Sequence, residues 1–224
     1  PLVSRADGAQ ADQERSPRRH VEVLVDKAHH LGGKGARQLL PGLGPGGAPA
    51  GLTDSLRTAP AWDGRVGPVT RLYSAYFLRA PEQGGLSYWV AKSRSGFRLT
   101  AISSVFASSS EFQHRYGSLS NSGFVTLVYQ NVLGRSPDSS GLAYWTKQLA
   151  SGKTRGSVMV GFSESTEHTR KQAPKVTAIE IWFGMLHRTP SAAELTSLAT
   201  RLGGTTKPTT VINEVLASNE YRAL

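Results

Sequence analysis

The chain contains no cysteine, which excludes a disulfide scaffold, a Cys-ligated zinc or iron–sulfur module and all thiol chemistry. It has no run of 18 apolar residues, so no segment is predicted to span a membrane. Asp138 is the only aspartate between residues 66 and 224, which excludes calcium loops that need several carboxylates close together. The chain begins at Pro1 rather than Met and carries no signal region, so we expect that a leader has been removed.

Motifs for catalysis are also lacking. Neither a G-x-S-x-G nucleophile elbow nor an H-E-x-x-H zinc helix occurs. The segment Ser151-Gly152-Lys153-Thr154 imitates a phosphate-binding loop, but Lys147 stands where that loop needs glycine. A glycosidase needs two carboxyl groups at a defined separation, and no spacing singles out a pair among Glu82, Glu111, Glu164 and Glu167. We therefore predict a non-enzymatic protein without cofactors, and keep hydrolysis of a cell-wall polymer as a residual alternative.

The six histidines form no recurring ligand set. His20, His29 and His30 lie near the N-terminus and could bind a transition metal loosely, but a solvated group is the favoured interpretation. The other histidines sit at unrelated positions of the repeat described below. No metal site is predicted.

Basic side chains exceed acidic ones throughout the chain. Lys and Arg number 26 against 16 Asp and Glu, a net charge of +10 over 224 residues. A basic surface attracts nucleic acid, anionic lipid and acidic glycans alike through long-range fields. The bases are scattered singly and no nucleic-acid recognition motif occurs. Acidic glycans, or a basic surface that is merely solvated, therefore rank ahead of nucleic acid.

Residues 1–65 form a Gly/Pro-rich arm that cannot build a core alone. One alternation, from Val21 to Val25, is typical of a strand. We predict that Val21, Val23 and Val25 contact a neighbouring subunit, and the alternative is a flexible linker.

From residue 66 onward the sequence repeats three times, in units 66–120, 121–173 and 174–224. Arg79, Arg135 and Arg188 are separated by 56 and then 53 residues, and Glu111, Glu167 and Glu220 show the same two spacings. Agreement between two markers indicates true repeats rather than a chance alignment. The third unit is the most divergent.

Each unit reads as three or four helices, which predicts an all-α fold. Val69, Leu72, Tyr73 and Tyr76 fall at the spacing of a helix with one buried stripe. Ser136-Pro137 and Thr189-Pro190 are expected to be an N-cap hydroxyl followed by proline at the first helical position, with Asp138 just inside the helix start. Gly152 is placed to end the following helix in a left-handed conformation.

The second unit carries the pattern Tyr129 … Leu133-Gly134-Arg135-Ser136-Pro137-Asp138 … Gly141 … Tyr144-Trp145 … Gly152 … Phe162 … Ser165 … Glu167. It resembles a bacterial family catalogued as domain of unknown function 4214, which is distantly similar to the helical linker domain of phycobilisomes. The first unit has Ala80-Pro81-Glu82 at the corner, and the third has Ser197-Leu198 in place of the Tyr-Trp pair. The family recurs in tandem in secreted and cell-surface proteins, so the resemblance implies an extracellular, non-enzymatic interaction or assembly role.

The Arg-x-Pro segments admit two interpretations. Their guanidinium groups could bind sulfate, phosphate or carboxylate groups of a glycan, or they could pair with the motif glutamates and hold the fold together. Recurrence together with the glutamates favours the structural role. The predicted structural motif comprises Arg79, Pro81, Trp89, Glu111, Arg135, Pro137, Asp138, Gly141, Trp145, Glu167, Arg188, Pro190 and Glu220.

Two Tyr-Trp pairs recur in units 1 and 2. Adjacent helical positions point about 100° apart, so the two rings of a pair cannot share one face. We predict Trp89 and Trp145 in the core, and Tyr88 and Tyr144 near the surface as possible ligand contacts with Arg79 and Arg135.

Together these features predict a secreted or cell-surface structural or adhesive protein. It would self-assemble as a homo-oligomer or polymer, or dock on the cell envelope, through its helical units and its arm. An acidic-glycan-binding module is the first alternative and a nucleic-acid-binding protein the second.

Overall fold

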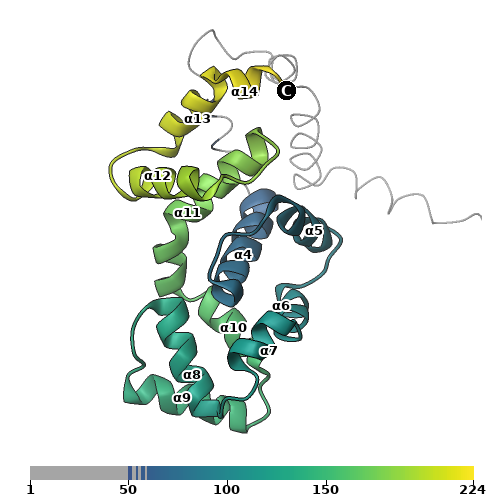
Figure 1. Ribbon diagram of the computed structural model, residues 1–224, viewed down its shortest axis with the longest axis vertical. Helices are drawn as coiled ribbons and strands as arrows, with labels where there is room; N and C mark the ends of the chain where they lie inside the picture. Colours follow the sequence, from purple (N-terminus) through teal and green to yellow (C-terminus); the bar gives the residue numbers. More distant parts are fainter. Residues whose placement is uncertain (1–49, 52–53, 55–56, 59) are drawn as a thin grey trace, which may run out of the picture.

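A computed structural model describes residues 50–51, 54, 57–58 and 60–224. The predicted subunit contacts Val21, Val23 and Val25, and the histidines at 20, 29 and 30, lie outside these residues. The described part is helical and contains no strand, which confirms the predicted all-α class (Figure 1). No helix in this part has the length and apolar character needed to cross a membrane.

The order of helices repeats along the chain. Unit 1 contains α4 (Pro60–Phe77), α5 (Gln83–Arg94), α6 (Leu99–Ala107) and α7 (Ser110–Tyr116). Unit 2 contains α8 (Asn121–Val128), the π-helical turn η1 (Tyr129–Leu133), α9 (Ser139–Ala150) and α10 (Arg155–Ser163). The chain then continues through α11 (Thr166–Met185), α12 (Ala192–Gly203), α13 (Pro208–Ala217) and α14 (Asn219–Arg222). Two of the boundaries that we placed fall inside helices: the one between residues 65 and 66 inside α4, and the one between residues 173 and 174 inside α11.

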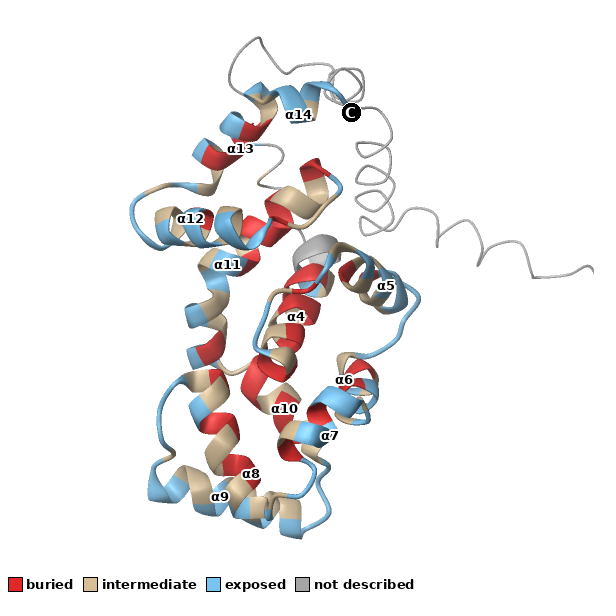
Figure 2. Ribbon diagram, viewed as in Figure 1, coloured by how far each residue is buried: buried red, intermediate tan, exposed pale blue. Residues whose placement is uncertain are grey.

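Units 1 and 2 share one hydrophobic core. Helix α4 lies at its centre and packs against α5, α6, α10 and α11. The predicted stripe of Val69, Leu72, Tyr73 and Tyr76 is buried in this core, and Figure 2 shows α4 and α10 among the most buried segments. A hydroxyl group deep in an apolar core needs a hydrogen-bond partner. The Tyr76 hydroxyl donates a hydrogen bond to the carbonyl oxygen of Ser103 at 2.9 Å.

A second, smaller core lies between α11, α12 and α13. Its buried residues include Ile181, Met185, Leu198 and Ile212, together with Ala50 from the segment before α4. An ion pair holds the same segment in place, since Arg57 Nη1 lies 2.8 Å from the buried carboxylate of Glu180 on α11. The described residues Ala50 and Arg57, just before α4, therefore pack against unit 3.

The starts and ends of helices follow the sequence closely, with one correction. Gly152 has φ +91° just after α9, and Gly96 has the same value after α5, as a left-handed helix end requires. The predicted caps Ser136 and Thr189 are wrong, because the N-cap residues are Asp138 and Ser191, one residue beyond each proline. The Asp138 carboxylate accepts a bond from Gly141 N at 2.7 Å, which a residue inside the helix is not placed to do.

Candidate functional site

Three sharp corners join the first and second helices of the three units. We call residues 78–82 corner 1, residues 134–138 corner 2 and residues 187–191 corner 3. Each begins with a residue in the left-handed region, Leu78 at φ 58°, Gly134 at φ 74° and His187 at φ 54°. This conformation is uncommon for residues other than glycine, so corners 1 and 3 hold strained backbone that the surrounding contacts must maintain.

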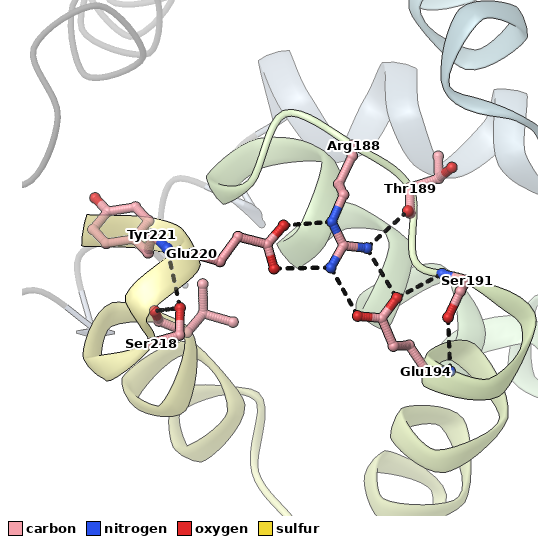
Figure 3. Close-up of polar contacts among 8 residues, drawn as sticks. Arg188, Thr189, Ser191, Glu194, Ser218, Glu220 and Tyr221 are labelled. Atoms are coloured by element: carbon pink, nitrogen blue, oxygen red, sulfur yellow. Dashed lines mark hydrogen bonds and ion pairs between the residues drawn. The ribbon is translucent and has the colours of Figure 1, made fainter. Parts of the chain in front are cut away.

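The arginine that follows the left-handed residue pairs with a glutamate 32 residues later in every unit. In corner 2, Arg135 Nε and Nη2 each donate to the Glu167 carboxylate at 2.8 Å. In corner 3, Arg188 Nη2 lies 2.9 Å from Glu220 Oε2, and Arg188 Nε donates to the other oxygen (Figure 3). In corner 1 the contact is longer, with Arg79 Nη2 at 3.7 Å from Glu111.

Each arginine also contacts a carboxylate at the start of the next helix. Arg188 binds both oxygens of Glu194, at 2.7 and 2.9 Å, so its guanidinium joins two carboxylates from different helices (Figure 3). Arg135 lies 3.8 Å from Asp138, and Arg79 bonds to Glu82. Hydrogen bonds from Arg188 lower the pKa of Glu194 to about 2, and those from Arg135 lower the pKa of Glu167.

An aromatic ring supports the arginine in the first two corners. Arg79 lies over the Tyr73 ring at 5.2 Å and Arg135 over the Tyr129 ring at 5.0 Å. The Tyr129 hydroxyl comes so close to Gly141 that a Cβ there would overlap it. This close approach explains the glycine in the motif. At Gly85, the counterpart in unit 1, an added Cβ would lie 3.7 Å from the nearest atom of Tyr73, which is an ordinary contact.

The corner prolines pack inward. Pro81 and Pro190 are buried and Pro137 is half-buried. Proline has no N–H to satisfy and fixes φ, so it suits a buried residue just before an N-cap. The helix that brings the motif glutamate begins at a serine in each unit: Ser109, Ser165 and Ser218 each accept a bond from the backbone N–H three residues later.

The geometry of the corners favours a joint of the fold over a ligand site. The guanidinium groups that could bind a glycan are bonded to carboxylates of the chain itself. These pairs are half-exposed, so each adds little stability alone, but the network at Arg188 fixes three elements at one point. Arg79 and Arg135 are about equally exposed, at 45% and 44%, and Arg188 is less exposed at 34%.

A groove of about 480 Å³ lies between corner 1 and corner 3. Its lining includes Arg79 and Glu82 on one side, Thr189 and Leu195 on the other, and Lys175 from α11. The groove thus has mixed polarity, with the charges of Arg79 and Glu82 already paired. Units 1 and 3, far apart in sequence, meet here.

The Tyr-Trp pairs lie at the edge of the core. Tyr88 and Tyr144 are each 53% exposed, at equivalent positions of α5 and α9. Trp89 and Trp145 are half-buried rather than in the core as predicted. Each tryptophan packs against the core from outside, Trp89 at 5.1 Å from the Phe106 ring and Trp145 at 5.2 Å from the Phe162 ring. The reason is that α5 and α9 cover the core on one side only, and α9 has no fully buried residue.

The described residues hold no group of three or more His, Asp or Glu placed to bind a metal ion. His168 is buried, and its Nδ1 lies 3.2 Å from the carbonyl oxygen of Val132. Burial is the main reason that the pKa of His168 is lowered. It occupies the position that Phe112 fills in unit 1, which makes it a core residue.

Two contacts that recur were not identified from the sequence. Arg115 donates to the carbonyl of Tyr76 at 2.9 Å, and Lys171 to the carbonyl of Leu133 at 3.1 Å. Both cations cap the end of the first helix of their unit. They are 56 residues apart, so extending the repeat comparison to basic residues would have found them.

Comparison with known proteins gives one family match. Residues 103–172, from α6 into α11, match the family model described as Domain of unknown function (DUF4214). This match confirms the resemblance drawn from the sequence and contains corner 2 with both Arg135 and Glu167. No match was found among curated proteins or solved structures.

Proposed function

Residues 103–172 of this chain belong to the DUF4214 family. We infer that the protein is a non-enzymatic structural or adhesive protein of the cell exterior. It would assemble with copies of itself or dock on the cell envelope, using a rigid body of helical units. The arm at residues 1–65 would supply part of the contact.

One observation carries this proposal: the recurring charged residues close the corners of the fold. A reactive centre needs acid, base or nucleophile side chains turned toward a substrate. Here Glu167 and Glu220 are bonded to Arg135 and Arg188, and their counterpart Glu111 lies near Arg79. Repeated units that use their motif residues for shape supply surfaces for contact, as tandem-repeat scaffolds do.

The remaining support is the surface charge. The chain carries +10, which favours association with acidic polymers of an envelope. Such attraction is screened by salt, with a Debye length of about 8 Å at 0.15 M. Adhesion through charge alone should therefore weaken steeply as salt is added, while adhesion that also uses apolar contacts should persist.

The test has two arms. Sedimentation with purified cell-wall fragments over a range of salt measures docking, and light scattering after size-exclusion measures self-association. The full chain should show one of the two, and substitution of aspartate for Val21, Val23 and Val25 should reduce self-association if the arm contributes. A monomer that remains unbound to cell walls at low salt would overturn the proposal.

Turnover assays on Glu111→Gln and Glu167→Gln address the residual enzyme alternative. We expect no hydrolysis of cell-wall polymers by the unchanged protein. Hydrolysis that either substitution abolishes, with helix content intact, would replace the structural role with a catalytic one.

A further inference from the structure

Two exposed tyrosines occupy equivalent positions in two units, and we propose that each is a binding platform for one residue of an acidic saccharide. We define platform 1 as Tyr88 with Trp89 and Lys92, and platform 2 as Tyr144 with Trp145 and Lys153. The inference rests on the proposed function and names the chemistry by which it would contact an envelope. Uronic-acid polymers, which carry a carboxylate on each sugar, are the ligand class.

The first argument is the exposure of the rings. Tyr88 and Tyr144 are both 53% exposed, while the aromatic residues of α4, Tyr73 and Tyr76, are buried. An exposed large apolar group that recurs at the same place in two units is informative in a way that a single one is not. Folding leaves both rings available, and Figure 2 shows that α5 and α9 each carry exposed residues.

The second argument is that each ring is held in place. The Trp89 ring meets Tyr88 edge to face at 4.8 Å, and the Trp145 ring meets Tyr144 at 5.1 Å. Since the tryptophans in turn pack on Phe106 and Phe162, each tyrosine is braced from the core. A braced ring loses little conformational freedom on binding, which favours affinity.

The third argument is charge. Helices α5 and α9 contain basic residues and no acidic ones. Lys92 Nζ lies 5.5 Å from the centre of the Tyr88 ring, and Lys153 Nζ lies 5.6 Å from that of Trp145. At platform 1, a sugar ring stacked on Tyr88 would place its carboxylate beside Lys92. At platform 2, a sugar that spans Tyr144 and the adjoining Trp145 would bring its carboxylate to Lys153. The platforms therefore favour an acidic sugar over a neutral one.

The charged groups at the platforms are lysines, because the corner arginines are already engaged. Arg79 and Arg135 bond to carboxylates of the chain itself. Lysine is a compact point charge, so one ammonium group suits the single carboxylate that each uronic-acid residue carries.

Unit 3 provides an internal comparison. Ser197-Leu198 replaces the Tyr-Trp pair, Leu198 is buried, and Arg201 pairs with Glu214 at 2.8 Å. Helix α12 of unit 3 thus has no aromatic ring at this position, and its one basic residue, Arg201, is already paired. The proposal accordingly requires two sites in the chain, one in each of units 1 and 2.

The experiment titrates the full chain with an oligogalacturonate by calorimetry and follows tryptophan fluorescence, since Trp89 and Trp145 adjoin the binding rings. We expect two sites for the unchanged protein, one for Tyr88→Ala or Tyr144→Ala, and binding at least about tenfold weaker, equivalent to 1.4 kcal/mol, for the double variant. The double Tyr→Phe variant is the matched control, because it keeps both rings and should keep both sites. Circular dichroism checks that the variants retain their helices.

Three results would overturn the inference. One is binding that the double alanine variant leaves unchanged, which would mean attraction by net charge alone. Another is equal affinity for neutral dextran. The third is tighter, tyrosine-dependent binding of an oligothymidylate, which would assign the platforms to nucleic acid.

The outcome is separable from that of the proposed function. Oligogalacturonate binding with no retention on cell walls would support the platforms and refute envelope docking. Retention on cell walls that survives loss of both tyrosines would support docking and refute the platforms.

Discussion

Gly141 and Gly85 hold the same position in two units, the third residue of the helix after each corner, yet alanine should have opposite effects at the two sites. At Gly141 a Cβ would overlap the Tyr129 hydroxyl oxygen and lie 3.2 Å from Tyr129 Cζ. The Tyr129 ring cannot retreat freely, because it is buried and meets the Phe162 ring at 4.9 Å. At Gly85 the nearest atom is 3.7 Å away, an ordinary contact.

The magnitudes follow from two competing terms. Alanine is favoured over glycine within a helix by up to about 1 kcal/mol. Overpacking a rigid site costs about 1–3 kcal/mol. Gly85→Ala should therefore raise the free energy of unfolding by about 0.5–1 kcal/mol, and Gly141→Ala should lower it by about 1–2 kcal/mol. For a chain of this size, each 1 kcal/mol corresponds to about 2–4 °C in Tm.

Thermal and urea unfolding followed by circular dichroism provide the assay. Tyr129→Phe removes the overlapping oxygen, so the double variant Tyr129→Phe, Gly141→Ala should recover part of the stability lost by Gly141→Ala. A double-mutant cycle isolates that coupling. Equal Tm shifts for the two glycine variants, or no recovery in the double variant, would refute the steric explanation of the motif glycine.

Three further predictions concern buried and paired charges. Burial is the main cause of the lowered pKa of His168, so the unfolded chain binds the proton more readily than the folded chain. The free energy of unfolding should therefore fall as pH drops below about 6.5. His168→Phe should reduce the fall in Tm between pH 7 and pH 5. Arg188 lowers the pKa of Glu194 from 4.5 to about 2. The stabilisation that this ion pair gives is therefore present above pH 4.5 and is lost as pH falls toward 2. Glu194→Gln should remove that part of the acid sensitivity in urea titrations. Glu180→Ala removes the buried partner of Arg57, which keeps only the more exposed Asp54, and should cost about 1–3 kcal/mol with faster proteolytic cleavage near residue 57. Glu214→Ala at an exposed pair should cost under about 1 kcal/mol.

The helical class and the repeat were predictable because both depend on local patterns. The stripe from Val69 to Tyr76 has the spacing of a buried helical face, and its burial is confirmed. The left-handed end at Gly152 needed only the glycine and its position. The N-caps were placed two residues early, since Ser136 and Asp138 are both residue types that cap helices, and the proline between them is compatible with a cap at either position.

The candidate site was harder to predict, because its contacts join distant segments. Equal spacing marks Arg188 and Glu220 as partners, but it does not show that Glu194 binds the same guanidinium, although the Ser191-x-x-Glu194 capping box is visible in the sequence. The half-buried state of Trp145 depends on Gly161, where a Cβ would come within 2.6 Å of the indole. That packing between α9 and α10 has no signature in either helix alone.

The joint between units 2 and 3 differs from the joint between units 1 and 2. Arg135 follows Glu111 by 24 residues and the chain breaks its helix between α7 and α8, whereas Arg188 follows Glu167 by 21 residues and α11 runs through without a break. The second connection is thus three residues shorter than the first, and it forms one continuous helix, α11, where the first forms two, α7 and α8.

An unbroken helix transmits every change in its length as rotation. Adding one residue to α11 turns everything beyond it by about 100° and advances it by about 1.5 Å. The α7–α8 loop, in contrast, can take up an extra residue locally. Insertions and deletions among relatives should therefore be tolerated between the first two units and excluded from α11. The length of α11 fixes the orientation of the last unit relative to the other two.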